Sequence, residues 1–404
     1  EQPAASVVFD DAHRALSREA ASRAMTLVKN DAVDGSPVLP IDPAKTTSIA
    51  LIGRLATVAN TGDHGSSDVR TPHVVTAEEG LRSAFRAATI TVVDDDAPEA
   101  AARAAAAADV ALVVAGYTAD DEGEYVGQEM FTLPQLQALY PPAPEGVSTG
   151  LFFDDTGNIV GGTGAGGDRA SLRLRPVDAE IIRAVAAANP RTVVAVVAAG
   201  AVITEEWRDR VPAVLFSWYA GSEGGHALAD VLTGAVDASG RLPFSVPTDE
   251  THLPFFDRDA TAITYDRWFG QRLLDRDGHA AAFPLGWGLS YTAFTIADLE
   301  VGAADAETIP VSVTVTNTGP RAGRHVVQVY GCPIGAADFP ARVLLGFAPV
   351  ALGSGESATV RIAASTRPLQ RWTDAGFAPA SSRVRVEAAA FAGDPDAPAA
   401  EVAL

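Results

Sequence analysis

Between residues 35 and 247, short apolar runs alternate with helix-forming segments. The apolar runs cover residues 48–52, 88–93, 109–115, 192–198 and 213–218, and the helix-forming segments cover 99–108, 178–189 and 223–232. Near-continuous apolar strands separated by helices are typical of a parallel sheet with both faces covered. The pattern therefore predicts an α/β sandwich over residues 35–247: an open, mostly parallel sheet with helices on both faces.

The N-terminal segment has a helical period. Apolar residues recur at helical spacing through residues 10–30, at Ala12, Leu16, Ala20, Ala24 and Leu27. This spacing predicts one amphipathic helix over residues 10–30, within an N-terminal helix and linker of residues 1–34.

From about residue 299 the apolar period becomes two. The run PVSVTVTN (310–317) alternates cleanly, and further short runs at 326–330, 358–362 and 384–388 are separated by turn residues. This pattern predicts an all-β sandwich over residues 299–404. Residues 248–298 show no regular spacing of apolar positions, and we expect them to form an ordered connector. We expect burial of its aromatic residues, Trp268, Phe269, Phe283, Trp287, Tyr291 and Phe294.

The net charge of the chain argues against nucleic acid and membrane partners. The 404 residues include 30 Lys and Arg and 51 Asp and Glu, a formal net charge of −21. A chain this acidic repels phosphate backbones and anionic lipids, so we expect no nucleic acid and no membrane partner. No apolar run reaches the roughly 18 residues of a membrane span, and no signal peptide is visible. The compartment, cytoplasmic or secreted, is left open.

Metal and nucleotide chemistry have little support in the sequence. Cys332 is the single cysteine, and the seven histidines are scattered. The glycine-rich stretch 161–167 is not followed by GK[ST], and no GxGxxG joins a strand to a helix. We therefore expect no metal and no cofactor.

Polar residues follow two of the predicted strands, where an open α/β sheet binds ligands. The segment 117–125 crowds Asp120, Asp121, Glu122 and Glu124. Like charges this close raise one another's pKa, and a general acid has to stay protonated near neutral pH. The alternative is a solvated acidic loop or a cation site, although the spacing is not that of an EF-hand.

The segment 60–72 follows the first strand. Its residues Asp63, His64 and Ser66 are candidates for binding the hydroxyl groups of a substrate, and the alternative is a tight polar turn.

Several motifs in one order resemble the C-terminal half of glycoside hydrolase family 3. They are residues 13–30 (HRALSREAASRAMTLVKN), 62–80 (GDHGSSDVRTPHVVTAEEG), 218–243 (WYAGSEGGHALADVLTGAVDASGRLP), 283–294 (FPLGWGLSYTAF) and 311–323 (VSVTVTNTGPRAG). The resemblance covers nearly the whole chain. It implies that residues 35–247 are the family's α/β sandwich and residues 299–404 its fibronectin type III-like domain.

The resemblance implies part of a retaining, β-glucosidase-like glycosidase. In the family the nucleophilic aspartate stands in an "SDW"-like motif on a catalytic barrel, and this sequence has no such motif. We therefore expect the nucleophile on a barrel-bearing partner chain, either the other half of a cleaved enzyme or a separately encoded subunit. The expected ligand is a small glycoside.

The resemblance also bears on the general acid/base, which in the family is a glutamate followed by glycine. Glu122-Gly123 matches that step, whereas the Asp-Arg pair expected soon after appears only at Asp168-Arg169, beyond an insertion. We prefer Glu122 and keep Glu124 as the alternative, with Asp63, His64 and Ser66 as substrate-binding candidates. The competing function is a non-catalytic carbohydrate-binding or structural subunit, and a small-molecule-binding flavodoxin-like domain is weaker.

Overall fold

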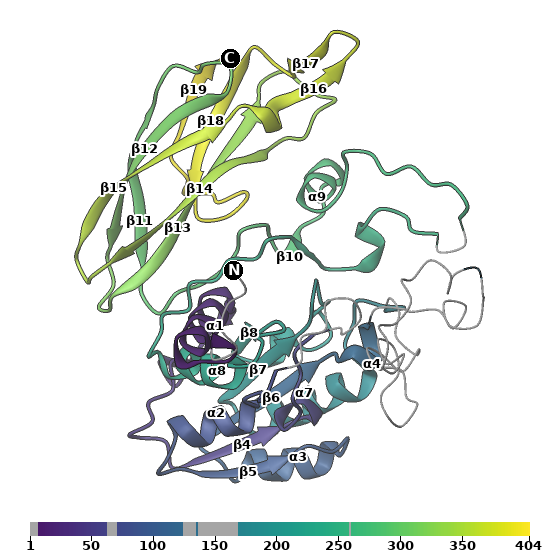
Figure 1. Ribbon diagram of the computed structural model, residues 1–404, viewed down its shortest axis with the longest axis vertical. Coiled ribbons are helices and arrows are strands. Elements are labelled where there is room, and N and C mark those ends of the chain that lie inside the picture. The colour runs from purple at the N-terminus through teal and green to yellow at the C-terminus, as the bar shows by residue number, and fades with distance from the viewer. Residues whose placement is uncertain (1–6, 63–70, 124–134, 136–168, 258–259) are drawn as a thin grey trace, which may run out of the picture. The chain divides into compact units, whose positions relative to one another are not determined.

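The computed structural model describes residues 7–62, 71–123, 135, 169–257 and 260–404 (Figure 1). The chain divides into two compact units. The first comprises Glu1–Ala21, Pro43–Gly200 and Phe216–Ala229, and the second comprises Ser22–Asp42, Ala201–Leu215 and Asp230–Leu404. Within the described residues, no helix is both long and apolar enough to cross a membrane.

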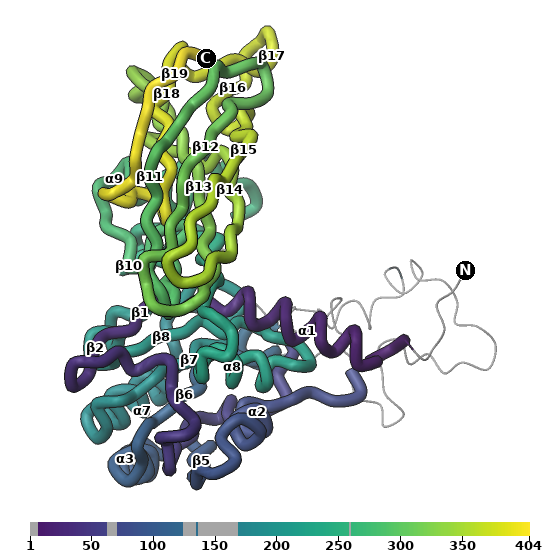
Figure 2. Tube along the Cα trace, turned by 90° about the vertical axis from the view of Figure 1, so that its left-hand side faces the viewer, coloured from purple at the N-terminus to yellow at the C-terminus, as the bar shows by residue number. Residues whose placement is uncertain are grey.

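Parallel strands form the centre of the first unit. They pair in the order β7-β6-β4-β5, with bounds Thr192–Val197, Val110–Gly116, Ser48–Ile52 and Thr89–Val93. Every residue of β6 is buried, as both-face coverage requires. The helices of this unit are α1 (Asp11–Ala24), α2 (Ala77–Ala84), α3 (Pro98–Ala106), α4 (Ala119–Glu122), α7 (Pro176–Ala188) and the start of α8 (Gly224–Thr233). Figures 1 and 2 show α3 and α7 on one face of the strands and α2 on the other. The predicted α/β class is confirmed.

Local sequence signals fix where these helices begin. Thr76 and Glu79 form a capping box at α2, in which the Glu79 N–H donates to Thr76 Oγ1 and the Thr76 N–H donates to Glu79 Oε2. Helices α3 and α7 each open on a proline, whose missing N–H costs nothing at a first helical position.

The predicted helix over residues 10–30 is wrong in its last six residues. Helix α1 ends at Ala24, and Thr26–Asn30 form strand β1, a neighbour of β8 (Ala213–Phe216). The helical spacing of Leu27 also fits a buried strand, and long-range bonds decide between the two. The Leu27 carbonyl accepts from Leu289 N–H at 2.7 Å, and the Val28 carbonyl accepts from Trp287 Nε1–H at 2.9 Å.

A two-sheet β-sandwich occupies the C-terminal part of the second unit. One sheet has the order β11-β12-β15, with bounds Phe294–Val301, Thr308–Asn317 and Ser357–Ser365. The other has the order β14-β13-β18-β19, with bounds Val343–Leu352, Gly323–Pro333, Arg383–Ala389 and Ala399–Ala403. All pairs are antiparallel, and Val311, Val313 and Val315 point into the common core. The predicted all-β sandwich is confirmed.

The connector between these domains is ordered around α9 (Gln271–Asp277) and the strand pair β9 (Val246–Pro247) and β10 (Ala281–Phe283). Phe283 is buried as predicted. The expected burial of Phe269 is wrong, because its side chain is 54% exposed. The Arg272 guanidinium, 5.2 Å from the ring centre, covers this ring in place of a hydrophobic core.

Two glycines allow α2 and α8 to approach each other closely. A Cβ on Gly80 would lie 1.9 Å from the Gly225 carbonyl oxygen, and a Cβ on Gly225 would lie 1.9 Å from the Thr76 carbonyl oxygen. Neither position has room for a side chain unless the backbone moves.

We predict that Gly80→Ala lowers the free energy of unfolding. We expect a loss of about 1–2 kcal/mol from overpacking. Helix propensity alone would stabilise the variant by about 1 kcal/mol, because alanine favours a helix over glycine, so a net loss shows that overpacking is the larger effect. The measurement is urea unfolding. Gly200→Ala is the control, because its nearest atom, Arg169 Nη2, is 3.8 Å from the ideal Cβ. An equally stable Gly80→Ala protein would contradict the packing argument.

Candidate functional site

The acidic segment begins at a tight turn after β6. Gly116 has a φ of +144°, and a Cβ there would lie 1.9 Å from the Val197 carbonyl oxygen, so only glycine fits without distortion. The short helix α4 follows, capped by Thr118 and Asp121, with the Thr118 N–H donating to Asp121 Oδ2 at 2.8 Å. The turn therefore uses Asp121 as a structural acceptor.

Asp121 is also paired with a cation. Arg54 Nη2 lies 2.5 Å from Asp121 Oδ2, and the same nitrogen donates to the Gly116 carbonyl at 2.9 Å. Burial by itself would raise the pKa of Asp121, but the hydrogen bonds from Arg54 and Thr118 outweigh it and hold the pKa below its ordinary value. Asp121 therefore serves both as the cap of α4 and as the ion-pair partner of Arg54.

Glu122 is the most heavily bonded carboxylate of this segment. Its Oε1 accepts the Tyr219 O–H at 2.5 Å and the Ala199 N–H at 3.0 Å. Its Oε2 lies 2.7 Å from Arg169 Nε, and only 8% of the side chain is exposed. These partners follow β8, β7 and the insertion, so the side chain ties together the carboxyl ends of strands that are distant in sequence.

Tyr219 reaches Glu122 from a strained turn. Trp218, just before it, has a φ of +58°, which is uncommon for a non-glycine residue and costs energy. Burial, and then the adjacent Glu122 carboxylate, raise the pKa of Tyr219 far above its ordinary value. The Tyr219 hydroxyl therefore stays protonated and donates a hydrogen bond to Glu122.

Arg169 is held on a second side by an aromatic ring. Its guanidinium carbon lies 4.3 Å from the centre of the Tyr117 ring, and the Tyr117 O–H donates to the Arg173 carbonyl at 2.6 Å. Since Glu122 precedes the insertion and Arg169 follows it, their ion pair joins the two ends of that segment.

Three donors contact the Glu122 carboxylate: the Arg169 guanidinium, the Tyr219 O–H and the Ala199 N–H. The carboxylate is therefore held by partners from three separate segments of the chain.

The other predicted site residues, Asp63, His64, Ser66 and Glu124, lie outside the described residues. The start of the 60–72 segment is described, and Asn60 Nδ2–H donates to the Tyr117 carbonyl at 2.8 Å. Residues that follow three different strands therefore meet here, because Tyr219 bonds to Glu122 and Asn60 bonds to Tyr117, at the start of the Glu122 segment.

Sequence reasoning missed a buried carboxylate, Glu223, in the motif of residues 218–243. Arg14 Nε lies 2.6 Å from Glu223 Oε1, and His226 Nδ1 lies 2.7 Å from Oε2. Burial would raise the pKa of Glu223, but the hydrogen bonds from His226 and Arg14 lower it overall. The available signal was a lone glutamate before Gly224, where α8 begins.

The described part of the chain offers no group of three or more His, Cys, Asp or Glu side chains arranged to hold a metal ion.

Family profiles match both parts of the chain. The profile described as "Glycosyl hydrolase family 3 C-terminal domain" matches residues 25–291, and the one described as "Fibronectin type III-like domain" matches residues 325–391.

Curated relatives are longer proteins. The chain is 41% identical over 212 residues to beta-glucosidase B of Emericella nidulans, a match that covers 48% of this chain and 25% of that protein. It is 31% identical over 388 residues to an exo-alpha-(1->6)-L-arabinopyranosidase of Bifidobacterium breve, covering 91% and 45%. The chain therefore spans less than half the length of these relatives.

Solved structures share the fold over nearly the whole chain. A GH3 beta-glucosidase of Bifidobacterium adolescentis superposes with a TM-score of 0.79 at 27% identity, covering 99% of this chain and 55% of that one. The beta-D-glucoside glucohydrolase of Trichoderma reesei, at 24% identity, gives a TM-score of 0.80 with coverages of 98% and 56%, which speaks for the fold alone.

We predict a pH-dependent contribution of Asp121 to stability. Asp121→Asn should lower the free energy of unfolding at pH 7 by about 1–3 kcal/mol, as expected for hydrogen bonds to a charged group. Because the folded pKa is depressed, this contribution is fully present above the unfolded value of about 3.9 and is lost as the pH falls through the folded pKa.

Urea unfolding of both proteins at pH 7 and pH 3 checks this, with the exposed neighbour variant Asp120→Asn as the control. A difference between wild type and Asp121→Asn that stayed constant across this range would rule out the ion pair as its source.

Proposed function

Because the chain belongs to glycoside hydrolase family 3, we propose that it supplies the general acid/base and part of the sugar site of a retaining glycosidase. The substrates that we propose are small β-glucosides or α-L-arabinopyranosides, the classes in the names of the relatives. The observation that carries the proposal is the convergence of Glu122, Tyr219 and Asn60 at the carboxyl ends of the strands, where open α/β sheets bind ligands.

The acid/base of the proposal is one of the two glutamates that flank Gly123. The sequence favoured Glu122, and its bonds to Arg169, Tyr219 and the Ala199 N–H suit a side chain that positions its segment. These contacts favour Glu124 as the acid/base and make Glu122 the residue that positions the start of its segment.

The proposed reaction uses two carboxyl groups about 5–5.5 Å apart. The acid/base protonates the departing glycosidic oxygen while a nucleophilic aspartate attacks the anomeric carbon, and a glycosyl-enzyme forms. The same glutamate, now ionised, then takes a proton from water as that water hydrolyses the intermediate.

The nucleophile of the proposal lies outside these 404 residues, on a barrel-bearing polypeptide of the same enzyme. Support comes from length: matched relatives extend well beyond the region that this chain covers. An intact-mass measurement of the purified enzyme tests whether the barrel is a second chain, as we propose, or an extension of this one.

We predict different kinetic signatures for the two glutamates in the barrel-containing enzyme. Glu124→Gln should lower kcat/KM for an alkyl or unactivated aryl glycoside by about 10²–10⁴-fold, because the leaving group loses its proton donor. It should have little effect on a dinitrophenyl glycoside, whose leaving group needs no proton. Added azide should restore turnover and yield a glycosyl azide.

Glu122→Gln is the matched control. It should reduce rates equally for good and poor leaving groups, give no azide rescue and lower the unfolding temperature, because Arg169 and Tyr219 lose a charged hydrogen-bond acceptor. If azide rescued Glu122→Gln instead, the assignment would be reversed. If neither variant altered hydrolysis, a non-catalytic subunit would be the better description.

A further inference from the structure

The connector displays a cluster of large apolar side chains to solvent. Phe255 is 80% exposed and Phe256 is 67% exposed, and three more side chains are 45–54% exposed, those of Ile263, Tyr265 and Phe269. The described part of the chain has twelve large hydrophobic side chains that are exposed, and five of them fall between residues 255 and 269. Single exposed apolar residues are normal, whereas a concentration of them marks an interaction site.

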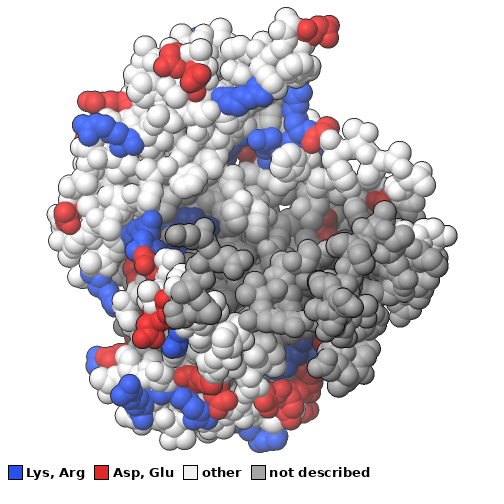
Figure 3. Space-filling model, viewed as in Figure 1, with Lys and Arg blue, Asp and Glu red and all other residues white. Residues whose placement is uncertain are grey.

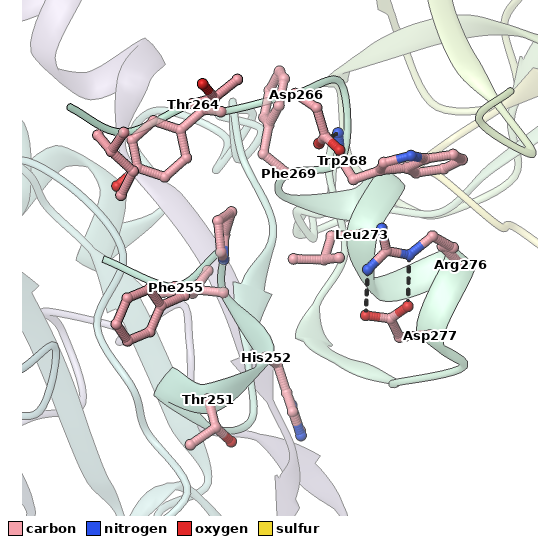
Figure 4. Close-up of a pocket in the computed structure, with 14 residues that line it drawn as sticks. Thr251, His252, Phe255, Thr264, Asp266, Trp268, Phe269, Leu273, Arg276 and Asp277 are labelled. Atoms are coloured by element: carbon pink, nitrogen blue, oxygen red, sulfur yellow. Dashed lines mark hydrogen bonds and ion pairs between the residues drawn. The ribbon is translucent and has the colours of Figure 1, made fainter. Parts of the chain in front are cut away.

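Four of these side chains line a hollow of about 520 Å³ (Figure 4). Phe255 lies on one side of it and Phe269 on the other, with Leu273 of α9 between them (Figure 4). Acidic and basic side chains are interspersed over the face in Figure 3, with wide uncharged areas between them. We call Phe255, Phe256, Ile263, Tyr265 and Phe269 the connector surface.

Helix α9, which directly follows the connector surface in sequence, is held in place. Leu273 and Leu274 bury one side of α9, and Gln271 Oε1 accepts from Ser245 Oγ–H at 2.8 Å and from Leu285 N–H at 3.2 Å. Phe269 therefore stands beside an ordered helix.

Further contacts fix the aromatic residues beside α9. Asp266 Oδ1 accepts the Trp268 N–H at 2.7 Å. The Arg276 guanidinium lies 5.1 Å from the centre of the Trp268 ring and is paired with Asp277 at 2.7 Å. A ring plane already covered by a guanidinium is a poor stacking platform for a sugar.

We propose that the connector surface is the docking surface for the barrel-bearing polypeptide of the same enzyme, an inference that rests on the proposed function. Solved relatives superpose on 97–100% of this chain, yet the chain covers only 54–63% of theirs. The family's enzymes therefore contain a further body of protein, and a second copy of this chain would not provide it.

The composition of the surface fits a protein partner. Interface cores are enriched in aromatic residues and arginine and depleted in lysine and glutamate. The connector surface has three phenylalanines and a tyrosine, with the Arg272 guanidinium over Phe269 at its edge. Aromatic anchors of this kind supply most of the binding energy of an interface once they are desolvated.

Hydroxyl-radical footprinting tests the proposal. The 404-residue chain alone and the assembled enzyme with its barrel are oxidised in parallel. Oxidation of Phe255, Phe256 and Phe269 should fall about fivefold or more on assembly, as expected for desolvated anchors. Phe347 and Trp372, exposed aromatics of the β-sandwich, are the internal reference and should change less than about twofold.

A pair of variants tests the energetics. Phe255→Ser with Phe269→Ser should raise the dissociation constant for the barrel polypeptide about 30-fold or more. The matched pair Phe347→Ser with Trp372→Ser should raise it less than about threefold. Unfolding temperatures equal to that of the wild type show that both variants fold.

Three results would overturn the proposal. The rings could stay fully oxidisable in an assembled and active enzyme. That result would contradict the docking surface but not the proposed function. They could become protected in the chain alone as its concentration rises, which assigns the surface to a second copy. They could be protected by glucose or arabinose alone, which makes it a sugar site. If the rings were protected from oxidation on assembly but Glu124→Gln kept full activity, the proposed function would be wrong and the docking surface would still be supported.

Discussion

The ion pair between Glu122 and Arg169, whose side chains are 8% and 12% exposed, is the interaction on which the candidate site depends. A pair with so little solvent around it is screened less than a surface pair, so its loss should cost more than the loss of one surface contact. Tyr219 and the Ala199 N–H also donate to Glu122, so this carboxylate links three segments at this edge of the sheet.

The two compact units carry different parts of the proposed function. The first offers a rigid, charge-balanced frame at the strand ends, where a neighbouring glutamate can act on a glycosidic oxygen. The second holds an exposed aromatic surface on an ordered connector, which suits contact with further protein. A family 3 enzyme divided between this chain and a barrel would need both a shared site and a surface that holds the two together.

Most of the fold followed from periodicity, and the failures have physical causes. Strand β4 has the bounds that its apolar run predicted, because a both-face buried strand has few alternatives. Strand β1 was mistaken for helix, since the spacing of Leu27 suits either structure and the bonds that select the strand come from residues more than 250 positions away. Glu122 was singled out because acidic residues cluster around it in the sequence. Its partner Arg169 lies 47 positions later, and no sequence pattern indicates a pair of residues so far apart. Phe269 was expected to be buried because it is aromatic. Residue type alone does not tell which aromatic side chains of a connector stay exposed.

The central proposal is that Glu122 is held in place by its partners and that a different carboxyl group transfers the proton. A crystal structure of the assembled enzyme trapped as a 2-fluoroglycosyl intermediate tests it directly. We expect Glu122 to remain bonded to Arg169, Tyr219 and Ala199, with another carboxyl group beside the bound sugar. A structure in which Glu122 has left Arg169 and faces the anomeric centre would contradict the account.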